Sequence, residues 1–185
     1  DVYKRQSEHI AQFASTSKIT FAGGGVGFVS AASNVLQSLS AHLSVQTVGP
    51  DKVNQLRHAR FLSGRIAEHM EQHATILRPK FALVDRMLSE QLGALDIANW
   101  TQPNGGYFIS LDVLPGLAQK VVAMAKTAGL VLTPAGATFP YGIDPEDRNV
   151  RIAPTFGSLS ELQGAMQILT LCVKLASARH LLAQG

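Results

Sequence analysis

The segment 15–18 (Ser-Thr-Ser-Lys) places an amine beside several hydroxyl groups, and a run of glycines at 23–25 follows it closely. Burial lowers the pKa of a lysine, and the neutral amine can attack a carbonyl carbon to form a Schiff base. The hydroxyl groups of Ser15 and Ser17, with backbone N–H groups of the glycine run, can hold a phosphate. The segment is not a P-loop, because Lys18 precedes the glycines. Two alternatives remain: a site for a carbonyl compound that carries a phosphate, or an ordinary loop with an exposed lysine.

A second candidate group is the guanidinium of Arg151, which lies in the apolar segment 149–153 (Asn-Val-Arg-Ile-Ala). The rigid fork of arginine suits a carboxylate that binds through both oxygens, and an arginine inside a short buried strand needs such a partner. The alternative is an edge strand whose arginine reaches water. The sequence alone leaves both open.

Two other sets of side chains could bind a metal or a phosphate, but both have simpler explanations. His69 and His73 share one helix face at a spacing that can bind zinc, but the glutamate between them does not fit the protease pattern and no third ligand is evident. We therefore expect no metal site and a solvated helix face. Arg57, Arg60 and Arg65 are interpreted as surface charge, because no groove-reading motif accompanies them.

The elements that position these groups fall into two halves, the first of them helical around the glycine run. Residues 13–28 are interpreted as a strand end or turn that enters a glycine loop, and residues 29–43 as a helix. Apolar positions recur close to every 3.6 residues between 51 and 77, which predicts another helix. Pro79 is expected to interrupt that pattern, so that a separate helix covers 81–92.

The second half is predicted to be a compact α+β unit. The segment 103–106 (Pro-Asn-Gly-Gly) is typical of a hairpin turn, and Ser158 with Glu161 forms a capping box before the final helix. Cys172 falls on the apolar face of that helix and is interpreted as a core residue. The other expected elements are a helix from Pro115 to Gly129 and strands at 98–102, 106–112, 131–133 and 149–153.

The composition limits the class of protein further. The chain has 185 residues, 46% apolar and 16% charged, with a net charge of +3 and one cysteine. A disordered tail and a disulfide scaffold are excluded, no apolar run approaches the roughly 20 residues of a membrane span, and the small charge does not suggest a nucleic-acid surface. The low charged fraction indicates large interfaces or a missing part. Residues 1–6 resemble read-through of a sequencing adapter and are expected to be non-native.

Four segments of the chain form an ordered set. They are 15–21 (Ser-Thr-Ser-Lys-Ile-Thr-Phe), 103–112 (Pro-Asn-Gly-Gly-Tyr-Phe-Ile-Ser-Leu-Asp), 133–142 (Thr-Pro-Ala-Gly-Ala-Thr-Phe-Pro-Tyr-Gly) and 149–155 (Asn-Val-Arg-Ile-Ala-Pro-Thr). As a set they resemble the fold-type I, pyridoxal-phosphate-dependent aminotransferases, most closely the class Ic aspartate aminotransferase group. The resemblance implies an α/β fold in which residues 7–77 form the C-terminal part of the large cofactor domain and residues 78–185 form the α+β small domain.

The resemblance also implies a role for each candidate residue. Lys18 matches the lysine that holds pyridoxal 5'-phosphate as an internal aldimine and then moves the proton between the substrate α-carbon and the cofactor. Ser15 and Ser17 match hydroxyl positions near the cofactor phosphate. Arg151 matches the arginine that binds the substrate α-carboxylate.

One departure from the family pattern concerns the phosphate. Many aminotransferases have an arginine about eight residues after the lysine that also binds the phosphate, and here that stretch is glycine-rich. The class Ic group shows this glycine-rich form. Backbone N–H groups of residues 23–25, or a cationic residue upstream of the chain, would have to replace the missing charge.

The function implied is transamination of an amino acid, L-aspartate with 2-oxoglutarate, by a cytoplasmic homodimer of which this chain is a C-terminal fragment, inactive by itself. No metal, nucleic acid or membrane is implied. The alternatives are an aminotransferase for alanine or an aromatic amino acid, an aminotransferase-like effector domain of a transcription regulator, and a plain α/β interaction domain. A side-chain carboxylate needs a second cationic partner, and no residue of this chain is a clear candidate.

Overall fold

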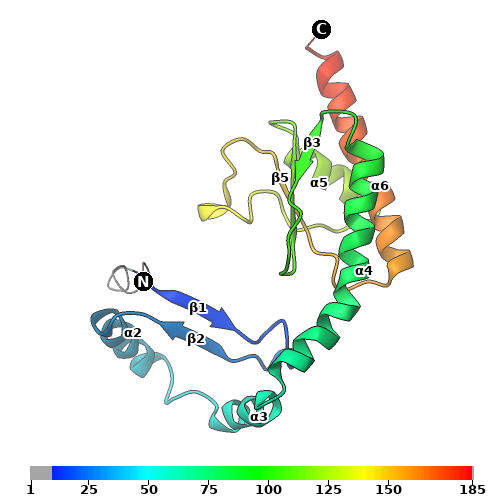
Figure 1. Cartoon of the computed structure of the whole chain (residues 1–185). Coiled ribbons are helices and arrows are strands. Elements are labelled where there is room, and N and C mark those ends of the chain that lie inside the picture. Colours follow the sequence, from blue (N-terminus) through cyan, green and yellow to red (C-terminus); the bar gives the residue numbers. More distant parts are fainter. Residues whose placement is uncertain (1–9, 185) are drawn as a thin grey trace, which may run out of the picture. The chain divides into compact units, whose positions relative to one another are not determined.

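The computed structural model describes residues 10–184 of the chain (Figure 1). They form two compact units whose boundary lies between Ala74 and Thr75. The segment 1–6, which is expected to be non-native, lies outside the described residues. From residue 10 to residue 184, no helix has both the length and the apolar character needed to cross a membrane.

The first unit begins with a two-stranded antiparallel ribbon, in which β1 (Gln12–Ser15) pairs with β2 (Gly27–Ser30) and Ser15 lies opposite Gly27. The loop between the strands carries Lys18 and the glycine run, as expected. The prediction of a helix from residue 29 is wrong at its start, because Val29 belongs to β2. β-Branched and aromatic side chains favour such a paired strand, and the pairing with β1 outweighs the apolar pattern that suggested a helix.

Three helices follow: α2 (Ser33–Gln46), α3 (Lys52–Leu62) and α4 (Ile66–Leu92). The single helix expected from 51 to 77 is broken, because the chain turns at Gly64 with a φ of 69° that favours glycine. The interruption expected at Pro79 is also wrong, since α4 runs through this residue. An interior proline costs a helix about 3 kcal/mol. The apolar face that follows is buried and offsets this cost.

The second unit contains a three-stranded antiparallel sheet in the order β3-β4-β5, with β3 at Ala98–Trp100, β4 at Ile109–Val113 and β5 at Asn149–Ile152. The expected hairpin is therefore confirmed, and β5 is an edge strand. The strand expected at 131–133 does not form. Leu132 packs against the core without pairing with the sheet, whereas Val131 is 80% exposed.

Alternation along the strands gives the sheet two different faces. Residues 109, 111 and 113 of β4 and residues 150 and 152 of β5 are buried, while the residues between them point to the other face. Ser110 lies opposite Arg151, and Asp112 lies opposite Asn149. Arg151 therefore lies on the face of the sheet that does not form the core.

The core of this unit is formed by the buried face of the sheet, the second part of α4, and the helices α5 (Ala118–Thr127) and α6 (Leu159–Leu182). A short 3-10 turn, η2 (Pro140–Gly142), precedes β5. Ser158 and Glu161 form the expected capping box at the start of α6. Cys172 is buried, as expected, and this burial raises the pKa of its thiol.

A substitution at Leu88 can test the assignment of this core, because the Leu88 side chain lies on α4 and is completely buried. We expect Leu88→Ala to lower the free energy of unfolding by about 2–5 kcal/mol, since it removes buried apolar surface and leaves a cavity. Urea unfolding of the purified protein measures this. Leu171→Ala is the matched control, because Leu171 is 65% exposed in α6 and its loss should change stability by less than about 0.5 kcal/mol. Equal losses for the two variants would contradict the assignment of the core.

Candidate active site

Lys18 lies in a tight turn that is closed by its neighbour Thr16. The Thr16 N–H donates to the Val26 carbonyl (3.0 Å), and its hydroxyl oxygen accepts from the Val26 N–H (2.9 Å), so the two arms of the loop are joined. The Thr16 carbonyl also accepts from the N–H groups of Ile19 (3.0 Å) and Thr20 (3.1 Å). These bonds fix the backbone on both sides of Lys18. Thr16, which is only 6% exposed, is a residue that the sequence analysis missed.

The two predicted serines lie together beside this turn. The Ser15 hydroxyl donates to the Ser17 hydroxyl oxygen (2.7 Å) and accepts from the Ser17 N–H (3.0 Å). Gly25 packs directly against Ser17, because a Cβ atom at residue 25 would lie 2.7 Å from the Ser17 Cα. Only glycine allows this approach. The structure thus brings Ser15, Ser17 and Gly25 together, close in the chain to Lys18.

The glycine run meets the rest of the unit in a way the sequence did not predict. The Gly24 N–H donates to the Phe21 carbonyl (3.1 Å), so this N–H is used within the loop. On its other side, a Cβ atom at Gly24 would lie 3.1 Å from Arg57 Nη2. The guanidinium of Arg57 stacks over the Phe21 ring at 4.1 Å, a cation–π contact. Arg57, which was interpreted as surface charge, therefore packs against the loop that follows Lys18.

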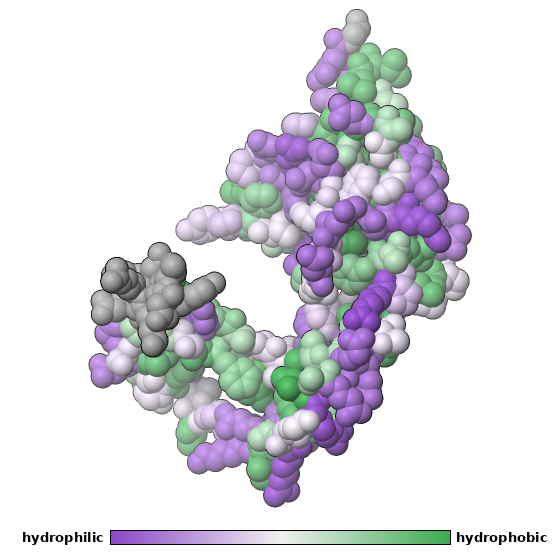
Figure 2. Space-filling view, viewed as in Figure 1, coloured by the Kyte–Doolittle hydropathy of each residue, from purple (hydrophilic) through white to green (hydrophobic). Residues whose placement is uncertain are grey.

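The burial considered for Lys18 is not found in this part of the chain. Lys18, Ser15 and Ser17 are all exposed. The ribbon that carries them is also exposed and presents large apolar side chains, with Phe13 at 74% and Phe28 at 56% exposure. Figure 2 shows the apolar surface over β1 and β2. Desolvation of the Lys18 amine is thus not supplied by the described residues of the first unit.

His69 and His73 differ from the solvated pair expected on the helix face, because both are half-buried in the first unit. His69 Nε2 contacts the carbonyl of Ile19, and the His69 ring packs edge-on against Phe61 at 5.0 Å. Within residues 10–184 there is no group of three or more metal-binding side chains. His69 therefore supports the loop after Lys18 from α4.

In the second unit, Arg151 lines a cavity of about 380 Å³. Its guanidinium stacks over the Phe108 ring at 4.5 Å, and Nη2 donates to the Thr133 hydroxyl oxygen at 3.3 Å. Its Nε is buried and has no hydrogen-bond partner among the described residues. A buried donor without a partner costs about 1–3 kcal/mol. The cavity is lined by Thr101, Phe108, Ser110, Thr138, Phe139, Asn149 and Arg151.

The neutral polar groups of this cavity are fixed by one another. The Asn149 side-chain amide donates to Ser110 Oγ and to Asp112 Oδ1, both at 2.7 Å, and Asn149 Oδ1 accepts from the Thr138 hydroxyl at 2.9 Å. Arg151 is the one charged side chain among the residues that line the cavity. The cavity can therefore hold one carboxylate, with aromatic and neutral polar surface beside it.

Asp144 holds the chain at the start of β5 and so supports the position of Arg151. Its Oδ2 accepts from the N–H groups of Arg148 and Asn149, both at 2.8 Å, and its Oδ1 accepts from the Glu146 N–H at 3.1 Å. Desolvation by itself would raise the pKa of Asp144. The backbone hydrogen bonds outweigh it and hold that pKa below its ordinary value of 3.8.

We expect Asp144→Asn to destabilise the protein by about 1–2 kcal/mol at pH 7, because the carboxylate accepts charge-assisted hydrogen bonds. The pKa of Asp144 is lowered in the folded state, so this stability is present above pH 3.8 and is lost as the pH falls through the folded value. Urea unfolding at a series of pH values measures this. The difference between parent and variant should shrink below about pH 4. Glu90→Gln, which removes an exposed carboxylate, is the control; a pH-independent difference for Asp144→Asn would contradict the assignment.

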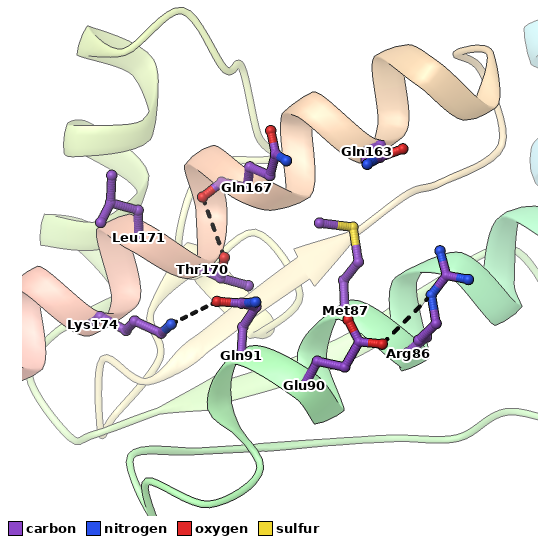
Figure 3. A pocket seen from close by; sticks show the side chains of 9 residues that line it. All are labelled: Arg86, Met87, Glu90, Gln91, Gln163, Gln167, Thr170, Leu171 and Lys174. Carbon is purple, nitrogen blue, oxygen red and sulfur yellow. Dashed lines mark hydrogen bonds and ion pairs between the residues drawn. The ribbon is translucent and has the colours of Figure 1, made fainter.

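A second cavity of about 440 Å³ lies between α4 and α6 (Figure 3). Its charged side chains interact with neighbouring groups: Lys174 donates to Gln91 Oε1 at 2.7 Å, and Arg86 lies 3.9 Å from Glu90. None of the predicted site residues lines it. This second cavity therefore adds nothing to the candidate site.

The fold of this chain matches that of solved aminotransferases. The crystal structure of an aspartate transaminase from Corynebacterium glutamicum matches it with a TM-score of 0.85 and 43% identity, over 94% of this chain and 41% of that chain. An α-aminoadipate aminotransferase from Thermus thermophilus, solved with N-(5'-phosphopyridoxyl)-L-leucine, shares the fold with a TM-score of 0.81 and 18% identity over 96% of this chain and 45% of that chain. The expected fold-type I aminotransferase architecture is confirmed.

The family follows from the sequence comparison. The aspartate amino-transferase family model matches residues 6–185, and the chain therefore belongs to this family. A relative from Mycolicibacterium smegmatis, named as a candidate aminotransferase, is 51% identical over 92% of this chain and 40% of its own length. The aspartate aminotransferase of Corynebacterium glutamicum is 45% identical over 91% of this chain and 39% of its own length. The chain thus spans about two fifths of these relatives.

A more distant relative belongs to another functional class. It is named as an uncharacterised HTH-type transcriptional regulator, YdfD, from Bacillus subtilis. It is 25% identical over 92% of this chain and 35% of its own length. Its similarity is much weaker than that of the two aminotransferase relatives.

Proposed function

We propose that the protein containing this chain is a pyridoxal-phosphate-dependent aminotransferase that acts on L-aspartate and 2-oxoglutarate. The observation that carries the proposal is the Lys18 turn, in which an amine, a hydroxyl pair and a closely packed glycine lie together. The name of the Corynebacterium glutamicum relative supports aspartate as the donor. The phosphopyridoxyl compound named for the Thermus thermophilus structure supports the cofactor.

The described residues fit this cofactor. Ser15 and Ser17 present exposed hydroxyl groups within hydrogen-bond distance of each other, and the absence of a side chain at Gly25 lets the glycine run pack directly against Ser17. These groups would hold the phosphate. The cofactor, when bound, supplies an electron-withdrawing ring that stabilises negative charge at the substrate α-carbon. Arg57 packs beside Gly24 and contributes positive charge to this loop in place of the missing arginine.

Each proposed catalytic and binding residue has one task. The amine of Lys18 would form the covalent link to the cofactor. Once the substrate amine has displaced it from that link, its freed Nζ would take up the proton that leaves the substrate α-carbon. The guanidinium of Arg151 would bind the substrate α-carboxylate in the cavity that it lines. A substrate held in this way is fixed in orientation, and this decides which bond at the α-carbon is broken.

The rest of the proposal concerns the whole protein. We infer that residues 7–77 belong to the large cofactor domain and residues 78–185 to the small domain, and that the protein is a homodimer. The exposed apolar side chains of β1 and β2 support a covering partner, either the remainder of the large domain or a second subunit. A side-chain carboxylate needs a cationic group besides Arg151, and the cavity lining contains none, so we expect that group to come from elsewhere in the dimer.

An amino-donor panel with the full-length protein tests this function. The protein is loaded with pyridoxal 5'-phosphate, and the initial rate with 2-oxoglutarate is measured for aspartate, alanine, an aromatic amino acid and a buffer blank. We expect the highest kcat/KM for aspartate. A preference for another donor would contradict the proposed specificity for aspartate. It would still agree with transamination as the reaction class.

The second candidate is a transcription regulator that uses this fold to sense an amino acid, which the distant relative from Bacillus subtilis supports. It predicts cofactor binding without turnover of any donor in the panel. It also predicts a basic DNA-binding segment in the full-length protein. Turnover at an ordinary enzymatic rate would eliminate it.

A further inference from the structure

His58 is a buried histidine to which the proposed reaction gives no role. It lies on α3 and is only 4% exposed. Its Nδ1 lies 2.9 Å from the Asn54 carbonyl and its Nε2 lies 2.8 Å from the Thr20 hydroxyl. Thr20 is two residues after Lys18, and its N–H and hydroxyl both lie within hydrogen-bond distance of the Thr16 carbonyl, at 3.1 and 3.0 Å. A series of hydrogen bonds therefore connects α3 to the turn that carries Lys18.

The donor and the acceptor of each hydrogen bond in this series follow from the chemistry of the groups. A carbonyl oxygen only accepts, so His58 Nδ1 donates to Asn54. In the neutral ring Nε2 then accepts, and the Thr20 hydroxyl donates to it. When the ring carries a second proton, Nε2 donates to Thr20, and the hydroxyl proton turns to the Thr16 carbonyl. The bond between His58 and Thr20 is kept in both protonation states.

Other side chains of α3 hold the far arm of the same loop. The Asn54 side-chain amide donates to the Gly24 carbonyl at 2.8 Å. The Phe21 ring packs edge-on against the His58 ring at 5.1 Å and lies under the guanidinium of Arg57 at 4.1 Å. One helix thus contacts the loop after Lys18 and again at the glycine run.

We propose that α3 is a clamp that positions the Lys18 turn, and that His58, through its hydrogen bond to Thr20, is its central positioning residue. The inference rests on the proposed function of Lys18. His58 acts through the backbone of the turn and does not touch a reacting atom. It fixes the direction in which the exposed Lys18 side chain points away from the loop. The serine pair and the glycines by themselves do not fix this direction.

The physical reason is the precision that proton transfer requires. A displacement of about 1 Å at a reacting group can lower a rate by about 10²-fold. Without the bond to His58, the Thr20 side chain keeps only its contact with the Thr16 carbonyl, so the turn opens more often. The amine then spends less time in the productive direction. Substrate binding through Arg151, which lies in the other unit, depends little on this change.

The test uses the full-length protein loaded with pyridoxal 5'-phosphate and a set of matched variants. Thr20→Val removes the hydroxyl at constant size, and Thr20→Ser retains it. His58→Phe keeps an aromatic ring beside Phe21 and removes both nitrogens. Thr127→Val is the control, because Thr127 makes the same kind of bond to a carbonyl four residues earlier, at 3.1 Å, from an exposed position of α5 in the second unit.

We expect Thr20→Val and His58→Phe each to lower kcat about 10-fold and to change KM less than about 3-fold. Thr20→Ser should restore the parent kcat, and Thr127→Val should leave it unchanged. The double variant should lose no more than the stronger single variant, because both remove the same bond. Multiplicative losses in the double variant would overturn the coupling.

Amide hydrogen exchange gives a measurement that does not depend on activity. The N–H groups of Ile19 and Thr20, which donate to the Thr16 carbonyl, should exchange about 10-fold faster in Thr20→Val and His58→Phe, with or without cofactor. Exchange and kcat equal to those of Thr127→Val would overturn the clamp. If His58→Phe does not fold, the comparison of Thr20→Val with Thr20→Ser still tests the proposal. A parent protein that transfers no amino group would instead contradict the proposed function, and the exchange result would still test the clamp.

Discussion

Replacing Lys18 by alanine is expected to lower kcat for amino transfer by at least about 10³-fold, while the melting temperature stays close to that of the parent. The magnitude follows because a positioned acid–base group contributes about 10²–10⁴-fold, and this residue would also form the covalent link to the cofactor. Stability should change little, because Lys18 is exposed and its alanine variant leaves the backbone hydrogen bonds of Thr16 intact.

Two further variants separate the chemistry of the amine from its charge. Lys18→Arg keeps a positive charge but cannot supply a neutral amine at ordinary pH, so it should be as inactive as the alanine variant. Lys126→Ala, on an exposed position of α5, is the control and should retain the parent rate. The visible absorption of the bound cofactor should change in both Lys18 variants. It should stay the same in Lys126→Ala. Full activity of Lys18→Ala would identify the segment as an ordinary loop.

The second large effect is expected at Arg151. Arg151→Gln should lower kcat/KM by about 10²–10³-fold, because truncating one partner of a buried hydrogen-bonded charge pair costs about 2–5 kcal/mol. Arg151→Lys should recover little, since an ammonium lacks the planar fork and cannot reproduce both the stacking on Phe108 and the bond to Thr133. Steady-state kinetics over a range of aspartate concentrations measures the loss.

The control for Arg151 is Arg86→Gln, which removes an exposed guanidinium from an i,i+4 pair on α4. It should leave kcat/KM unchanged. A substrate that lacks an α-carboxylate gives an independent check, because its low kcat/KM should be the same for the parent and for Arg151→Gln. A large effect of Arg151→Gln on that substrate would show that the arginine stabilises the cavity and does not bind the carboxylate.

Several parts of this organisation could be predicted from local patterns. The hairpin around 103–106, the capping box at Ser158 and the buried face of α6 follow from turn chemistry and helical period, which depend on neighbours in the sequence. The grouping of Lys18 with Ser15 and Ser17 was also visible, because these residues are adjacent in the chain. Pro79 was misjudged, because burial further along α4 outweighs the local preference of proline.

What could not be predicted depends on contacts between distant segments. Thr16 and Thr20 look like ordinary loop residues until the loop closes on Val26, and His58 acquires its role only when α3 packs against that loop. His69 and His73 have a spacing that can bind zinc and are expected on a solvated helix face for want of a third ligand, whereas both rings are half-buried. A single-sequence pattern contains no information on which helix will cover a loop, so the roles of Thr16, Thr20 and His58 could not be predicted.

The alternation of β4 and β5 has a consequence for how this protein can evolve. Along these two strands, core residues alternate with residues that line the cavity of Arg151, so neighbouring codons serve independent demands. Under the proposed function, changes at Ser110 or Asn149 would alter the substrate cavity without removing any side chain from the core, whereas changes at Leu111 or Val150 would alter stability first. A library aimed at new substrates should therefore vary every second residue of each strand and leave the residues between them untouched.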